Sequence, residues 1–194
     1  MRTFSVSFVV IAALTGWGLR ADAASTPQTP RSRPSPTVAS ALDFEISTIE
    51  KQILDAVEAM PENRFDFSPE RLTIPGGDYK GVRTFAQQAK HVAASNYAIW
   101  APLSDDVIPA DFKGGNGPES VKTKAEIERF LKDSFALGHK AAGQLTLQNV
   151  LATPGHSTSS RLRLMVFGVT HAFDHYGQMV EYLRMNGIVP PASR

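Results

Sequence analysis

Apolar residues recur every three to four positions through most of this 194-residue chain, and this spacing restricts the fold more than any other feature. The pattern predicts four helices, over about residues 40–60, 82–101, 123–153 and 159–186. No segment alternates apolar and polar residues with the β-branched enrichment of a strand. The sequence therefore predicts an all-α fold, a four-helix bundle with a long crossover loop.

Capping and helix-breaking residues mark where these helices begin and end. Ser40, with Asp43 three residues later, is the expected N-terminal cap of the first helix. Thr123 and Glu126 have the spacing of a capping box at the start of the third. The third helix is expected to continue until Pro154, because no earlier residue breaks its apolar spacing.

The N-terminal region has the pattern of a targeting segment followed by a linker. Residues 1–23 combine a charged start, an apolar stretch and a small-x-small ending, which predicts a cleavable signal peptide. Residues 24–38 are rich in proline and serine and are expected to form a flexible tether. The remaining residues, 39–194, have the size of one domain. We therefore expect a periplasmic or secreted protein that is not stably inserted in a membrane after cleavage.

Composition excludes several classes of function. The chain has no cysteine, which rules out disulfides, thiolate metal sites and a cysteine nucleophile, so any metal has to use His, Asp, Glu or water. A formal net charge of +1 without a basic run gives no support for a nucleic-acid partner. Motifs of serine hydrolases, nucleotide-binding loops and zincins are absent as well.

The histidines carry the most specific chemical signal. His171 and His175 are four residues apart on the predicted fourth helix, so both imidazoles lie on one face. A metal site of this kind usually has three protein ligands, and His91 in the second helix is the obvious third. From spacing alone, a metal site and three ordinary hydrogen-bonded histidines remain equally open. His139 and His156 fit a metal site less well.

Two segments resemble a known family. HAFDHYGQMVEYLRMNGIVPP, residues 171–191, resembles the C-terminal helix signature of the DinB-like (damage-inducible) superfamily, and RTFAQQAKHVAASNY, residues 83–97, resembles its second-helix segment. The resemblance implies a four-helix bundle that holds a divalent ion, usually zinc or nickel, through His91, His171 and His175. It also implies a metal-dependent hydrolase or thiol transferase with an unknown small-molecule substrate. The alternative is a non-catalytic metal- or ligand-binding module. Related bundles often pair, so a homodimer is a further expectation.

A few polar residues near these histidines are candidates for other roles. Gln178 follows His175 by three positions and is the expected catalytic residue, hydrogen-bonded to substrate or to metal-bound water. A hydrogen bond between helices is its structural alternative. Asp174 is expected to be a solvent-exposed charge, whereas Gln87 and Ser95, four residues either side of His91, are expected on its face.

Overall fold

A computed structural model describes residues 35–104, 106–108, 115–155 and 157–194. The predicted signal peptide and most of the predicted tether lie outside these residues. The described part contains four α-helices and no strand, which confirms the all-α prediction. The helices are α1 (Val38–Ala59), α2 (Phe85–Trp100), α3 (Lys124–Gly143) and α4 (Arg161–Met185), with short 3-10 helices between and after them.

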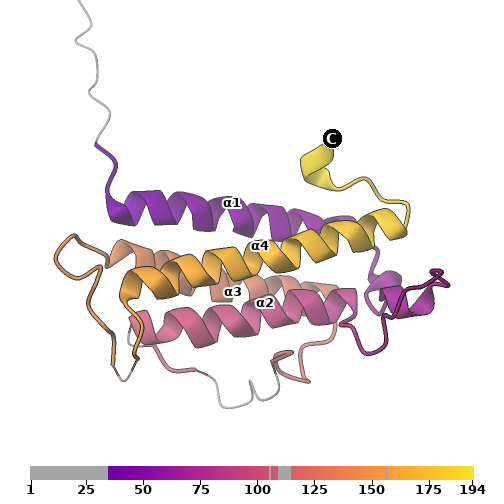
Figure 1. Cartoon of the computed structure of the whole chain (residues 1–194), viewed down its shortest axis with the longest axis horizontal. Coiled ribbons are helices and arrows are strands. Elements are labelled where there is room, and N and C mark those ends of the chain that lie inside the picture. Colours follow the sequence, from indigo (N-terminus) through magenta and orange to yellow (C-terminus); the bar gives the residue numbers. More distant parts are fainter. Residues whose placement is uncertain (1–34, 105, 109–114, 156) are drawn as a thin grey trace, which may run out of the picture. The chain divides into compact units, whose positions relative to one another are not determined.

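The four helices form a bundle in which α2 and α3, although consecutive in the chain, run in the same direction (Figure 1). Helices α1 and α4 run in one direction, and α2 and α3 run in the other (Figure 1). Each of α1 and α2 packs against both α3 and α4, so α1 and α2 occupy opposite corners. Because α2 ends and α3 begins at opposite ends of the bundle, the chain between them has to return along its length, as the predicted crossover requires.

Three helices begin with a capping box, in which a threonine is the N-cap and its partner lies three residues later. Thr123 and Glu126 form the predicted capping box of α3, and Thr84 and Gln87 form one at α2. In α1 the predicted cap is wrong, because the helix begins earlier. Thr37 is the cap, and its Oγ1 accepts a hydrogen bond from the Ser40 backbone N–H at 3.0 Å. Ser40 is therefore the second member of the box.

The predicted end of α3 is also wrong, by about ten residues. The helix ends at Gly143 rather than near Pro154. Beyond it, Thr146 and Asn149 each accept a backbone hydrogen bond from the other, at 2.8 and 3.2 Å, and this closes a turn. Leu145 is buried but lies past the helix end. Its apolar spacing continued the helical pattern because packing, and not helical structure, places an apolar residue there.

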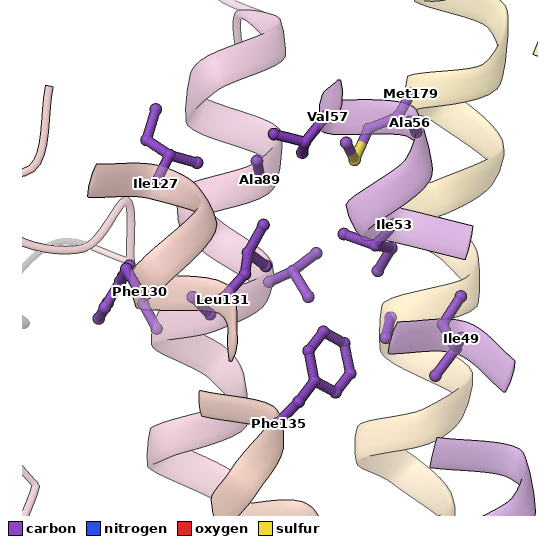
Figure 2. Close-up of a cluster of buried hydrophobic side chains, with 14 of the residues drawn as sticks. Ile49, Ile53, Ala56, Val57, Ala89, Ile127, Phe130, Leu131, Phe135 and Met179 are labelled. Carbon is purple, nitrogen blue, oxygen red and sulfur yellow. The ribbon is translucent and has the colours of Figure 1, made fainter. Parts of the chain in front are cut away.

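The core lies between the four helices along their length. Figure 2 shows Ile49 and Ile53 of α1 opposite Leu131 and Phe135 of α3, with Met179 of α4 beside them. All five side chains are fully buried. None of the helices in the described part of the chain has both the length and the hydropathy needed to span a lipid bilayer.

His139 joins α3 to α1 outside this core. Its Nδ1 lies 2.6 Å from Asp43 Oδ1 and its Nε2 lies 3.0 Å from Glu50 Oε2, both on α1. Burial disfavours the charged imidazole, but the hydrogen bonds and charges of the two carboxylates outweigh burial and raise the pKa of His139 above its ordinary 6.5. The sequence context of His139 predicts an exposed or a half-buried position, and the structure shows the half-buried one.

We expect His139→Gln to lower the free energy of unfolding more at about pH 6 than at about pH 9. A raised folded-state pKa contributes stability that is complete below the unfolded-state value and is lost as the pH rises through the folded-state value. Urea unfolding of metal-free protein at both pH values measures the difference. Lys51→Gln, which removes an exposed ion pair with Asp55 and involves no histidine, is the control. An equal loss at both pH values would contradict the assignment.

Candidate metal centre

The bundle brings His91 next to His171 and His175, although 80 residues separate His91 from His171 in the sequence. His91 lies in α2, and His171 and His175 lie one turn apart on the adjacent helix α4. Ring centroids are 5.2 Å apart for His91 and His171, 4.7 Å for His91 and His175, and 4.5 Å for the α4 pair. One ring nitrogen from each lies within 4.8 Å of the others, so the three can hold a metal ion.

Hydrogen bonds orient two of the rings so that Nε2 of each is left for a metal. His175 Nδ1–H donates to Gln88 Oε1 at 2.6 Å, and His91 Nδ1–H donates to the Gly115 carbonyl. His171 Nε2 lies 3.2 Å from His175 Nε2. Two zinc–nitrogen bonds of about 2.0–2.1 Å at the tetrahedral angle place their nitrogens about 3.3 Å apart. The donor set and this spacing therefore fit a tetrahedral ion such as zinc.

Burial keeps the imidazoles neutral. The pKa of His175 is lowered to about 4, first by burial and then by the neighbouring His171 and His91. Burial is also the largest cause of the lowered pKa of His171, and the neighbouring His91 is the second cause. The pKa of His91 is likewise lowered mainly by burial. Arg83 adds a positive charge that lowers all three. Because a metal binds only the neutral imidazole, the site is in the ligand form at neutral pH.

Residues 115–118, in the connection between α2 and α3, are held by three hydrogen bonds around His91, two from α2 and one from Arg83 just before it. Besides the bond from His91 to Gly115, Lys90 Nζ donates to the Pro118 carbonyl at 2.7 Å, and Arg83 Nε donates to Asn116 Oδ1 at 2.8 Å. Gly115 has φ of 73°, a left-handed conformation that glycine adopts without steric cost. The residue type at this position therefore allows the backbone carbonyl to reach the imidazole.

An open cleft of about 670 Å³ lies beside the histidines. Three lining residues are connected to the histidines. Gln88 bonds to His175, Gln178 bonds to Gln88, and Asn116 follows Gly115, which bonds to His91. None of the three histidines lines the cleft itself. Its volume is in the range of sites that enclose a small organic molecule.

The polar residues that the sequence singles out near the histidines differ in their positions relative to the cleft and in their exposure. Gln178 is on the cleft side of α4, where its Oε1 accepts from Gln88 at 2.8 Å and its Nε2 donates to Asp174 at 3.2 Å. Asp174 is exposed, as expected. Gln87 is exposed and is the capping partner of Thr84, although it also lines the cleft. Ser95 is half-buried. The catalytic role of Gln178 stays a prediction.

Sequence reasoning missed Gln88, whose carboxamide joins His175 to Gln178 and which is 2% exposed. The available signal was its position three residues before His91, which places it on the same helix face. A spacing of four residues from His91 predicted Gln87 and Ser95 instead. Which neighbour faces α4 depends on how far α2 is rotated in the bundle.

We expect Gln88→Ala to weaken zinc binding by about 10–100-fold, because the partner of a ligand imidazole fixes its tautomer and orientation. Competition with a chelator measures the affinity. Gln87→Ala, at the adjacent exposed glutamine, is the matched control and should leave the affinity unchanged. Gln88→Glu, which keeps an acceptor opposite His175, should restore at least part of the loss. Equal affinities for wild type and Gln88→Ala would exclude the orienting role.

Three neutral imidazoles on two adjacent helices define a helical-bundle protein with three histidines that could hold a metal ion. Comparison with protein families agrees, since the model of the DinB superfamily matches residues 45–179, a span that contains all three histidines. The chain belongs to the DinB superfamily. A comparison with curated proteins found no match.

Proposed function

We propose that this protein is an exported, metal-dependent enzyme in which His91, His171 and His175 hold zinc or nickel. The observation that carries the proposal is the convergence of three neutral imidazoles, two oriented by hydrogen bonds, beside a cleft of about 670 Å³. Three protein ligands leave coordination positions for other molecules, which is typical of catalytic and not of structural zinc sites.

A divalent ion bound there would lower the pKa of a coordinated water or thiol and supply a nucleophile near neutral pH. The chain's own residues supply the rest. Gln88 and the Gly115 carbonyl orient the ligand imidazoles, and Gln178 is placed to hydrogen-bond a substrate in the cleft. We rank hydrolysis slightly above thiol transfer, because an exported protein is separated from the cytosolic thiol pool.

A specific observation favours a second candidate, a non-catalytic metal- or ligand-binding module. Both ends of the Gln178 carboxamide are already bonded, to Gln88 and to Asp174. Gln88, which bonds to His175, and Asn116, next to Gly115, are amides as well, and amides do not act as general acids or bases. A cleft of this kind binds a ligand without the proton transfers that many hydrolytic reactions need.

Purified full-length protein without a histidine tag, loaded with zinc or nickel, provides the test. A screen for hydrolysis and thiol transfer should show an activity that is lost in His171→Ala while the helical circular dichroism stays the same. Metal uptake without any activity would support the binding module. An activity unchanged in His171→Ala would exclude a role for this centre in catalysis.

Export is tested separately, because it rests on the pattern of residues 1–23 alone. Full-length protein produced in a bacterium should be recovered from the periplasm or the medium, and N-terminal sequencing should begin at Ala24. Retention in the cytoplasm with Met1 intact would overturn this part of the proposal and leave the metal chemistry unaffected.

A further inference from the structure

The cleft contains a cation that the metal chemistry leaves unexplained. Arg83 lines the cleft, half-buried, just before the first turn of α2. Its Nε donates to Asn116, and its backbone carbonyl accepts a hydrogen bond from the Tyr182 hydroxyl at 2.9 Å. Among the residues that the structure describes, neither terminal nitrogen of Arg83 has a hydrogen-bond or ion-pair partner.

This guanidinium lies close to the metal centre. The point at which a side chain on Gly115 would begin lies 3.5 Å from His91 Nδ1 and 4.0 Å from Arg83 Nη2. A group bound by the free guanidinium nitrogens would therefore lie beside Gly115, whose carbonyl holds the His91 ring.

The other residues that line the cleft indicate the chemistry of the remainder of such a ligand. Val82, Tyr182 and Met185 supply apolar surface to the cleft. Glu181 adds a single carboxylate on the α4 side, and it forms no ion pair with Arg83 or with any other cation of the described chain. One cation and one anion in the lining favour a ligand with a single negative charge over a dianion, which Glu181 would repel.

We propose that the cleft binds a small molecule with an apolar body and a carboxylate, and that Arg83 receives the carboxylate through its terminal N–H groups. A guanidinium matches the planar geometry of a carboxylate and binds it with two parallel hydrogen bonds. Asn116 and Tyr182 hold Arg83 in place by bonding its Nε and its backbone, which leaves the terminal groups for the ligand. The inference rests on the proposed function only in treating this ligand as the substrate.

Hexanoate and its neutral isostere hexanamide are suitable probes, added to full-length protein that has been freed of metal so that no ion competes for the carboxylate. Titrations followed by nitrogen-15 NMR report the affinity of each, and the Arg83 Nε–H signal reports the site. Wild type should bind hexanoate at least about tenfold more tightly than hexanamide, because hydrogen bonds to charged groups are the stronger class.

Variants separate recognition from a structural role. Arg83→Gln should weaken hexanoate at least about tenfold and leave hexanamide unchanged, whereas Arg83→Lys should keep part of the preference because it keeps the charge. Arg129→Gln, which removes an exposed cation on α3, is the control and should change neither affinity. Asn116→Ala should alter hexanoate binding less than Arg83→Gln, because it removes only the Nε contact.

Equal binding of the two probes to wild type would overturn the proposal, and so would an unchanged hexanoate preference in Arg83→Gln. Both results are independent of the proposed enzyme activity, because no metal is present. A preference for hexanoate in a protein that shows no metal-dependent reaction would leave carboxylate recognition intact and contradict the proposed catalysis alone.

Discussion

Replacing His175 by alanine should remove tight zinc binding almost completely. We expect wild type purified without a tag and dialysed against zinc to retain about one equivalent, and His175→Ala to retain less than about a tenth. The physical reason is the number of ligands, since two imidazoles rarely hold a divalent ion against water. Elemental analysis of the dialysed protein gives the stoichiometry directly.

Two further variants make this result specific. His175 is buried, so its removal leaves a cavity, and His171→Ala at a half-exposed position should lose the metal with less effect on the fold. His139→Ala removes a histidine whose two ring nitrogens bond to carboxylates on α1, and this variant should keep its full equivalent of zinc. If the His175 and His171 variants retain zinc as wild type does, the ion is not bound where the three rings meet.

The second large effect concerns the packing of α3 and α4 against Trp100 of α2. A side chain on Gly168 of α4 would begin 2.4 Å from Trp100 Nε1 and 2.5 Å from Cε2, in a ring that is fully buried. Gly138 of α3 meets the same ring at 2.6 Å. Gly168→Ala should therefore lower the free energy of unfolding by about 1–3 kcal/mol, because the indole has no space into which to move.

Gly177 gives this prediction a matched control in the same helix. A methyl group there would meet no atom within 4 Å. Gly177→Ala should raise stability by about 0.5–1 kcal/mol, the intrinsic preference of a helix interior for alanine over glycine. Urea unfolding of both variants measures the contrast. Equal stabilities for the two would show that α4 can shift away from Trp100 and that the close approach has little energetic weight.

Gly138 and Gly168 illustrate what the sequence could not predict. Each lies within a regular helix, where the apolar spacing of the neighbouring residues predicts the helix correctly and treats glycine as a small loss. Their role depends on Trp100 of a third element, and contacts between elements are not contained in local periodicity. The wrong end of α3 has the same origin, because Leu145 is apolar on account of packing.

The candidate site likewise contains residues that spacing along the chain could predict and residues whose roles depend on how the helices pack. His171 and His175 could be paired from spacing, because a helix places residues four apart on one face. His91 could be added to them from the family resemblance and from the expectation that its helix faces theirs, and the structure confirms the proximity of the three rings. Gln88, Arg83 and the Gly115 carbonyl could not be assigned, because their roles depend on helix rotation and on a backbone group from a distant segment.

The placement of the three ligands on two neighbouring helices has a consequence for the lifetime of the protein. An ion that binds only when α2 and α4 are in contact stabilises the folded chain by about 2.7 kcal/mol when its free concentration is a hundred times the dissociation constant. That energy lowers by about a hundredfold the fraction of molecules in which the helices separate. Metal supply would then control degradation as well as chemistry, because a protease cleaves the separated state.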